Sequence, residues 1–441
     1  MHPNIAANQQ RLFLEFLAEL RPHLRRDCAL PRRLKEIFAR HRSIGSRDRK
    51  LYRELIYTAV RFLPWIDGLL DSDAQTAAKI IAWLLPTLPP TEAYQKTICG
   101  EWVLAPEDAD LKTRASTLHA NLGQIFPPGR PPQGGARPPD ALSADRREAG
   151  FHPCHPFDPQ ALLPAWFREH CPAAFTGPQL DAINSRASIW VRIQCPDRNL
   201  VLDEFRAKNW AFEQPADSPD AICLPPNAEV ANTDAYRRGF VEIQDLGSQL
   251  VLAHAAIAPG GRWLDACAGA GGKTLQLARL LGPQGHVDAT DIRPDILDEL
   301  RDRAQRARLD NISIVRGPTS VYDGALVDAP CSGSGTWRRQ PHLKWCVQPE
   351  ALVTFVRRQL EILTTNAPYV RAGGLLIYVT CSLSHYENRD VVAAFLKSHS
   401  QFTPEAPIKN YGDEYDGLGT SLLPGTRNTD GFYVALLRRQ S

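Results

Sequence analysis

The sequence predicts an α/β domain with a mostly parallel sheet, preceded by an all-α N-terminal domain and a small α+β subdomain. Three successive sequence patterns predict this organisation. Apolar residues at helical spacing come first, a Pro- and Gly-rich stretch follows, and strand and helix patterns alternate from about residue 246. A chain of 441 residues is also too long for one ordinary core. We therefore expect domains at residues 1–125, 161–245 and 246–441, with a linker at 126–160.

The N-terminal domain is predicted from two apolar stripes at helical spacing. Pro64 ends the second stripe, because proline cannot continue a helix interior. A basic stretch lies between the stripes, and exposed charge on a solvated helix face is its ordinary explanation. The stripes are Leu12, Phe13, Phe16, Leu17 and Leu20, and then Leu51, Leu55, Ile56, Ala59, Val60 and Leu63; the basic residues include Arg40, Arg42, Arg47, Arg49 and Lys50.

The middle of the chain holds the linker and the small subdomain. Residues 126–160 are too rich in proline and glycine for a helix or a central strand, so they are predicted to be a linker. Residues 161–245 mix a helix with short strand candidates such as Ser188–Ile193.

The C-terminal part alternates between strands and helices. Helices are predicted after the first strand through Leu281, from Pro294 with Leu297, Leu300, Ala304 and Ala307 on one face, and from about 350 to 370. The predicted strands are Arg262–Asp265, His286–Asp291, Ile312–Val315, Ala325–Val327 and Leu375–Val379.

Composition excludes several classes of protein. No apolar run is long enough for a membrane helix, and the N-terminus lacks the features of a signal peptide. The ten cysteines are scattered without a CxxC pair, which argues against a zinc site and a disulfide-stapled secreted domain. We expect free thiols, no metal, a cytoplasmic location and a monomer. The net charge of +2 does not exclude a local basic patch.

A glycine-rich turn between the first strand of the sheet and its helix predicts a nucleoside cofactor. Glycine permits close backbone approach, and the helix N-terminus offers free N–H groups. Cys267 stands where a P-loop needs glycine, and Thr274 stands where a dinucleotide fingerprint needs its third glycine. Asp291 follows the turn at the sequence distance where an acid would bind the ribose of a nucleoside cofactor. The turn comprises Cys267, Ala268, Gly269, Ala270, Gly271, Gly272 and Lys273.

Two cysteines follow predicted strands at the edge where an open α/β sheet binds ligands. Cys331 comes after Ala325–Val327, and Cys381 comes after Leu375–Val379. Most cysteines are small buried hydrophobes, but two at this edge beside a nucleoside turn are harder to explain as packing. A thiolate that adds to carbon 6 of cytosine makes carbon 5 nucleophilic, which is covalent catalysis. Asp328 is placed to assist near N3 and N4 of the base. Residue chemistry alone does not rank the two thiols.

Three ordered motifs, DACAGAGGKT, DAPCSGSGTWRR and YVTCSL, resemble those of the Sun-type (RsmB-like) family of RNA cytosine-5 methyltransferases. SRDRKLYRELIYTAVRF with WIDGLL resembles the NusB-like, RNA-binding helical domain of bacterial members, and VEIQDLGSQLV and DGFYVALLRR also fit the family. The resemblance covers most of the chain except the linker. It implies a Rossmann-like methyltransferase fold.

The resemblance also implies the roles of individual residues. Cys267–Lys273 and Asp291 would bind S-adenosylmethionine, and Asp328 would lie between the cofactor and the cytosine. Cys381 would be the nucleophile, and Cys331 would help to release the product. One departure is that the family's usual acid after the third strand is absent from Arg316-Gly317-Pro318.

RNA is the expected partner, with ribosomal (small-subunit) RNA preferred and transfer RNA possible. Arg338, Arg339 and Lys344 lie among tryptophans after Cys331, so we predict that they bind phosphates while the tryptophans stack on an unpaired base. Packing is the alternative explanation for the tryptophans. A catalytically weakened RNA-binding assembly factor remains a second hypothesis. A nicotinamide-dependent oxidoreductase is a third, which Thr274 disfavours.

Overall fold

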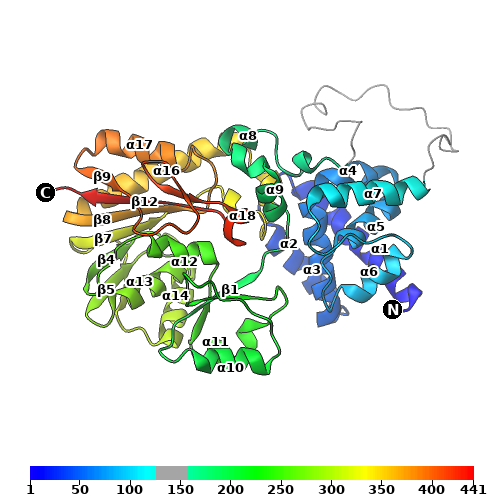
Figure 1. The fold of residues 1–441 in the computed structure, drawn as a ribbon, viewed down its shortest axis with the longest axis horizontal. Helices are drawn as coiled ribbons and strands as arrows, with labels where there is room; N and C mark the ends of the chain where they lie inside the picture. Colours follow the sequence, from blue (N-terminus) through cyan, green and yellow to red (C-terminus); the bar gives the residue numbers. More distant parts are fainter. Residues whose placement is uncertain (126–156) are drawn as a thin grey trace. The chain divides into compact units, whose positions relative to one another are not determined.

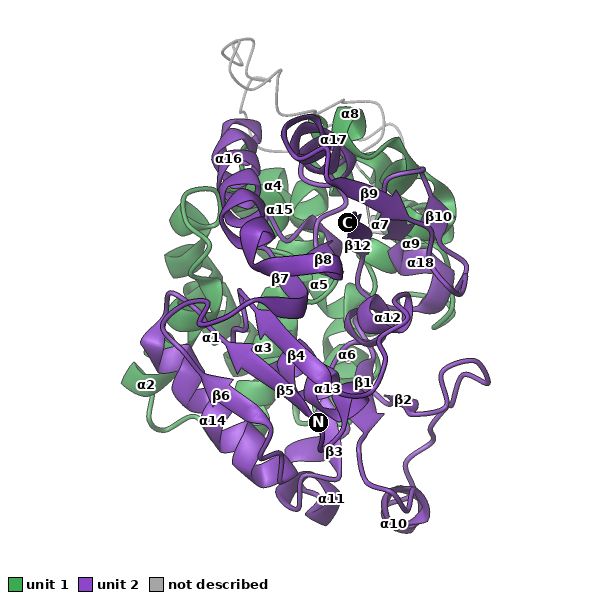
Figure 2. Cartoon of the chain, turned by 90° about the vertical axis from the view of Figure 1, so that its left-hand side faces the viewer, with its two compact units in different colours: residues 1–185, 337–348 green, residues 186–336, 349–441 purple. Residues whose placement is uncertain are grey.

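The computed structural model describes residues 1–125 and 157–441 and divides them into two compact units (Figure 2). Unit 1 comprises residues 1–185 and 337–348, and unit 2 comprises 186–336 and 349–441. The predicted linker, 126–160, lies almost entirely outside the described residues. The predicted small subdomain, 161–245, is divided between the units, because residues 161–185 group with the N-terminal helices.

Unit 1 is built from helices, and no strand occurs among its described residues (Figure 1). Nearly all residues of the two predicted apolar stripes are buried in its core. Pro64 lies in the first turn of a new helix, where its missing N–H is tolerated. The α-helices are α1 (Pro3–Leu20), α2 (Leu30–Arg40), α3 (Ser46–Arg61), α4 (Leu63–Ser72), α5 (Ala74–Leu84), α6 (Glu92–Cys99), α7 (Leu111–Ile125), α8 (Phe167–His170), α9 (Gly177–Ile183) and α15 (Leu343–Cys346).

Residues 337–348 join unit 1 although the chain on both sides belongs to unit 2. Trp337 packs against Phe167 with ring centroids 4.5 Å apart. A disulfide joins Cys28 to Cys346. The expectation that all cysteines are free is therefore wrong for this pair. Their separation of 318 residues explains why spacing along the chain gave no sign of it.

Unit 2 contains a small antiparallel sheet of order β2-β1-β3. Its strands are β1 (Ile189–Ile193), β2 (Ala221–Leu224) and β3 (Val241–Ile243), so the predicted strand Ser188–Ile193 is confirmed to within one residue. Helices α10 (Asn199–Ala207) and α11 (Asp234–Arg237) accompany this sheet.

The large sheet of unit 2 has nine strands in the order β10-β11-β12-β8-β7-β4-β5-β6, with β9 paired to β12. The pairs among β4, β5, β6, β7 and β8 are parallel, as predicted, and β12 runs antiparallel to β8. The strands are β4 (Gly261–Asp265), β5 (Gly285–Ala289), β6 (Ile312–Ile314), β7 (Tyr322–Asp328), β8 (Val370–Thr380), β9 (Phe402–Glu405), β10 (Glu414–Tyr415), β11 (Thr420–Leu422) and β12 (Phe432–Arg439).

Helices cover both faces of the large sheet, which makes unit 2 a Rossmann-like fold (Figure 1). One face packs against α16 (Pro349–Asn366) and α17 (Arg389–Ser398). The other packs against α12 (Leu246–Ala253) and α13 (Gly272–Leu281), with α14 (Pro294–Ala307) over β5 and β6. The predicted inner positions of α14, Leu297, Leu300, Ala304 and Ala307, are buried. A last short helix is α18 (Pro424–Arg427).

None of the helices in residues 1–125 and 157–441 combines the length and apolar character needed to span a bilayer. Within the same residues, no group of three or more His, Cys, Asp or Glu side chains is arranged to hold a metal ion.

Candidate active site

The glycine turn joins β4 to α13 in unit 2. Gly269 and Gly271 have φ angles of +52° and +87°, which L side chains rarely adopt. A Cβ on Gly271 would also lie 2.8 Å from Leu300, so this position requires glycine. Gly271 caps α13, whose first residues are Gly272 and Lys273. The turn thus presents backbone and a helix N-terminus at the carboxyl edge of the sheet.

Asp291, just beyond β5, holds this turn. Its Oδ2 accepts the Gly269 N–H at 2.9 Å, and both of its oxygens accept hydrogen bonds from Arg293. Burial acts to raise the pKa of Asp291, but these hydrogen bonds outweigh it and lower that pKa. Because the Arg293 side chain is 58% exposed, it can leave without disturbing the core. The acid is therefore placed to exchange Arg293 for another donor.

Lys273 and Asp328 form an ion pair between α13 and the end of β7. The Lys273 Nζ lies 2.8 Å from Asp328 Oδ2, and Lys273 is otherwise buried. The Asp328 side chain keeps 32% of its surface exposed. The carboxylate is thus oriented by the ammonium group and still accessible to a ligand.

Asp265, at the end of β4, was not singled out from the sequence. It is 1% exposed, and its Oδ2 accepts the Thr274 hydroxyl at 2.7 Å. Burial, with a contribution from Asp328, raises its pKa to about 7. Because Asp265 is buried beneath the glycine turn, the sequence motif did not indicate a role for it apart from the turn itself. Burial also raises the pKa of the neighbouring Cys267 well above its ordinary value.

The other turn residues lie in the same loop. Ala268 is buried, and its N–H bonds to the Thr290 carbonyl beyond β5. The carbonyl of Ala270 accepts the Arg303 Nη1 at 2.7 Å. Arg303 is itself held by Glu242, so the loop is fixed from the side of α14.

Cys331 and Cys381 lie together at the ends of neighbouring parallel strands. Cys331 follows β7, Cys381 follows β8, and their Sγ atoms are 3.4 Å apart. Both residues are partly exposed. Such a pair can share one proton, so that one sulfur acts as a thiol donor and the other as a thiolate acceptor.

The surroundings of Cys331 favour its protonated form. The contact with Cys381, burial and the negative charge of Glu387 raise the pKa of Cys331 well above its ordinary value. Cys331 is therefore favoured as a thiol, and the 3.4 Å approach allows a hydrogen bond between the two sulfurs.

A buried carboxylate, Glu387, connects the two cysteine loops. Its Oε1 accepts the Ser332 N–H at 2.8 Å and the Gln359 Nε2 at 3.0 Å. Its Oε2 accepts the hydroxyls of Ser332 and Ser382 at 2.5 and 2.6 Å. Ser332 follows Cys331 and Ser382 follows Cys381, so one side chain fixes both loops. We missed Glu387 in the sequence because it belongs to none of the three motifs.

The predicted phosphate-binding role of Arg338 and Lys344 needs correction, because both are buried in unit 1. Lys344 Nζ donates to the carbonyls of Arg61 and Leu162 and to Asn184 Oδ1, which uses all three of its protons. Burial lowers the pKa of Lys344 well below its ordinary value. The sequence pattern missed this because both residues belong to the segment that folds with unit 1. Arg339 is exposed.

Known proteins of one family are similar to this chain. Residues 253–438 match the family described as 16S rRNA methyltransferase RsmB/F. The chain is 31% identical to the "Ribosomal RNA small subunit methyltransferase B" of Escherichia fergusonii, over 64% of this chain and 67% of that protein. It is 27% identical to the "Probable ribosomal RNA small subunit methyltransferase B" of Bacillus subtilis, over 90% of this chain and 92% of that protein.

A solved structure shares the fold. The crystal structure of NSun6 from Pyrococcus horikoshii with SFG covers 63% of this chain and 97% of its own, with a TM-score of 0.58 and 16% identity. This likeness concerns the fold alone.

Proposed function

The chain belongs to the RsmB/F family of 16S rRNA methyltransferases, and from this premise we propose that it methylates carbon 5 of a cytosine in small-subunit ribosomal RNA. The methyl donor is S-adenosylmethionine, and Cys381 forms a covalent adduct with carbon 6 of the ring. The observation that carries the proposal is the 3.4 Å approach of two cysteine sulfurs beside the glycine turn.

The residues around the turn fit S-adenosylmethionine. The two left-handed glycines leave the backbone open to a nucleoside, and Asp291 is an acid suited to a pair of ribose hydroxyls. The N-terminal turn of α13 suits a carboxylate. When bound, the cofactor supplies an electrophilic methyl group. Arg293 occupies the acceptor sites of Asp291 that the ribose would need, so we propose that it swings out when the cofactor enters.

The two neighbouring thiols take different roles. Cys331 keeps its proton and donates a hydrogen bond to the Cys381 sulfur, which attacks carbon 6 as the thiolate. The choice of Cys381 as the nucleophile rests on the resemblance of its motif, YVTCSL, to the family. After methyl transfer a solvent base takes the proton from carbon 5 and the Cys381–carbon 6 bond breaks, which returns its electron pair to the Cys381 sulfur. The Cys331 thiol, 3.4 Å from Cys381 in the free protein, can donate a hydrogen bond to that departing sulfur.

Asp328 orients the base. A carboxylate paired with Lys273 is an acceptor, so we propose that it takes a hydrogen bond from the exocyclic amino group of the cytosine. A uracil presents a carbonyl oxygen at that position and would be rejected. The target base must be unpaired or flipped out to reach these groups. A protein that methylates ribosomal RNA is expected in the cytoplasm.

Trapping with RNA that contains 5-fluorocytosine tests the assignment. Fluorine at carbon 5 cannot leave as a cation, so the adduct with the nucleophile persists. We expect the wild type and Cys331→Ala to form the adduct and Cys381→Ala to form none. The reverse pattern would exchange the roles of the two thiols, and no adduct in any protein would refute covalent catalysis. Bisulfite sequencing of total RNA with and without the protein locates the modified cytosine.

A further inference from the structure

Unit 2 contains a cavity of about 400 Å³ that is separate from the cysteine site and shares no residue with it. It lies between the small sheet and helices α12 and α13. Part of its wall is apolar and belongs to one buried cluster: Ala221, Leu246, Leu250 and Tyr411. Its volume is in the range of small-ligand pockets.

Arg192 of β1 brings a buried positive charge to this cavity. The residue is 5% exposed, and its Nε donates to Gln244 Oε1 at 2.8 Å. Its Nη2 is buried with no hydrogen-bond partner among residues 1–125 and 157–441. An unpaired donor on a buried charge is unfavourable, so a native structure that keeps one calls for a partner.

The natural counter-ion of Arg192 is already engaged. Glu242 is its direct cross-strand neighbour, in the β1–β3 pair. However, the Glu242 carboxylate binds Arg303 through Oε2 and Arg306 through Oε1, at 2.9 and 2.6 Å. Burial, opposed by Glu242 and assisted by the charge of Arg279, lowers the pKa of Arg192 to about 10. Among residues 1–125 and 157–441, Arg192 thus has no acid in ion-pair contact.

Arg279 of α13 brings a second guanidinium group to the cavity wall. Within the described part of the chain it forms no ion pair with a carboxylate at up to 4.0 Å. It is half-buried, and burial lowers its pKa. Two arginines from different elements therefore meet one cavity, and within the described residues neither forms an ion pair with a carboxylate there.

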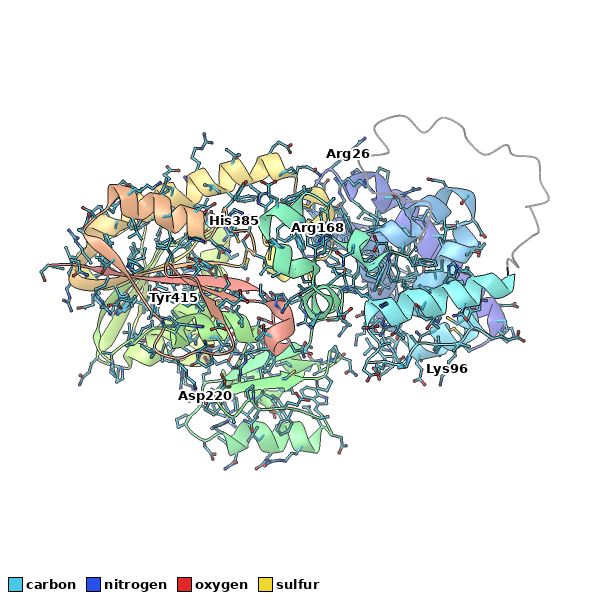
Figure 3. All side chains as sticks on the ribbon, turned by 45° about the horizontal axis from the view of Figure 1, so that its top comes forward. Arg26, Lys96, Arg168, Asp220, His385 and Tyr415 are labelled. Atoms are coloured by element: carbon cyan, nitrogen blue, oxygen red, sulfur yellow. A yellow bond between two sulfur atoms is a disulfide. The ribbon has the colours of Figure 1, made fainter. Side chains whose placement is uncertain are left out.

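The acids of the cavity do not balance this charge. Asp217 is bound through both oxygens by Arg427, at 2.5 and 2.6 Å. Asp220, labelled in Figure 3, is exposed at the end of the loop that leads into β2. Its charge acts to raise the pKa of Arg192 and Arg279, but it makes no ion pair within the described residues. Lys409, which bonds to the Asp217 carbonyl, adds a further positive charge above Tyr411.

We propose that this cavity is a phosphate-binding site, in which Arg192 and Arg279 hold the phosphate and the apolar wall holds the group that it esterifies. A phosphate offers oxygens in several directions, so it can bind two guanidinium groups that approach from different elements. The site does not depend on the proposed methyl transfer. Its phosphate comes either from the RNA backbone or from a small phosphate ester.

Titration of the full-length protein with inorganic phosphate, followed by ³¹P NMR at constant ionic strength, tests the site. The variant is Arg279→Gln, which leaves the core residue Arg192 intact. The matched control is Arg206→Gln, since Arg206 is an exposed arginine of the small subdomain with its own partner, Asp203. We expect Arg279→Gln to weaken phosphate binding by roughly tenfold or more, as for loss of a charged hydrogen bond, and Arg206→Gln to leave it unchanged. Arg192→Lys, which keeps the charge but not the planar fork, should also weaken it.

RNA titrations identify the source of the phosphate. If it comes from the RNA backbone, RNA displaces inorganic phosphate, and Arg279→Gln lowers the slope of log affinity against log salt by about 1. If it comes from a small ester, a 5′-nucleotide displaces phosphate while RNA does not. The proposal is overturned if phosphate fails to bind the wild type, or if it binds Arg279→Gln and Arg192→Lys as tightly as the wild type.

Discussion

Replacement of Glu387 tests whether one buried carboxylate holds the two cysteine loops together. Glu387 is 0% exposed, and it accepts four hydrogen bonds from Ser332, Ser382 and Gln359. Two substitutions separate its contributions. Glu387→Ala removes all four bonds, whereas Glu387→Gln keeps the shape of the side chain and removes its charge.

The two variants are expected to differ in stability. In Glu387→Ala the buried donors lose their acceptor, and the free energy of unfolding should fall by about 3–5 kcal/mol. In Glu387→Gln the amide oxygen can stay at the Oε1 position, where it faces the two N–H donors. Its NH₂ group then faces two hydroxyls, which can turn and accept. We therefore expect a loss of only about 1 kcal/mol for glutamine.

Catalysis should follow the geometry of the loops. Release of the loops by Glu387→Ala lets the Sγ atoms leave their 3.4 Å contact, and misplacement by about 1 Å costs roughly a hundredfold in kcat. Glu387→Gln should retain most of the activity, with an altered pH–rate profile because a negative charge near Cys331 is gone. The measurements are urea unfolding of each variant and kcat for methyl transfer at saturating RNA. A folded Glu387→Ala protein with wild-type kcat would refute the reasoning.

Three further predictions follow from the described contacts. Lys344→Met should lower the free energy of unfolding by about 2–4 kcal/mol in urea melts, because three acceptors lose their donor. The RNA affinity of this variant should be unchanged. Arg339→Ala, at an exposed position, serves as the control for stability. Arg293→Ala should tighten S-adenosylmethionine binding up to about fivefold in calorimetry, since the mostly exposed Arg293 no longer competes with the ribose for the buried Asp291; weaker binding would show that Arg293 contacts the cofactor. The pKa of Asp265 is raised to about 7, so between its unfolded pKa near 4 and pH 7 the native state binds more protons than the unfolded state and stability falls as pH rises. From pH 5 to 7 the wild type should lose about 2 kcal/mol relative to Asp265→Asn in paired urea melts, and parallel pH profiles would contradict the assignment.

The fold was largely predictable because its signals are local. Apolar periodicity marked α3 and α14, and a strand followed by a glycine turn marked the start of the sheet. The positions of Cys331 and Cys381 followed from one rule, that parallel strands share a carboxyl edge. The 3.4 Å approach of their two Sγ atoms could not be predicted from the sequence.

The failures have a common physical origin in contacts between distant parts of the chain. Arg338 and Lys344 have the composition of an RNA-binding patch, yet their partners lie more than 150 residues earlier, at Ser185 and Asn184 among others. Cys28 and Cys346 are still more remote, 318 positions apart in the sequence. Glu387 was missed because a carboxylate that fixes loops looks in sequence like any surface acid. Charge composition alone does not show whether a side chain faces water.

The passage of residues 337–348 into unit 1 means that the units are not separable modules. A shortened protein that begins at residue 186 would keep this segment and lose the helices that enclose it. Trp337 would then be exposed, and the Lys344 ammonium would lose all three of its acceptors. Such a fragment is expected to aggregate, whatever the stability of its sheet. A chimera that takes its N-terminal half from a relative must also take residues 337–348 from that relative.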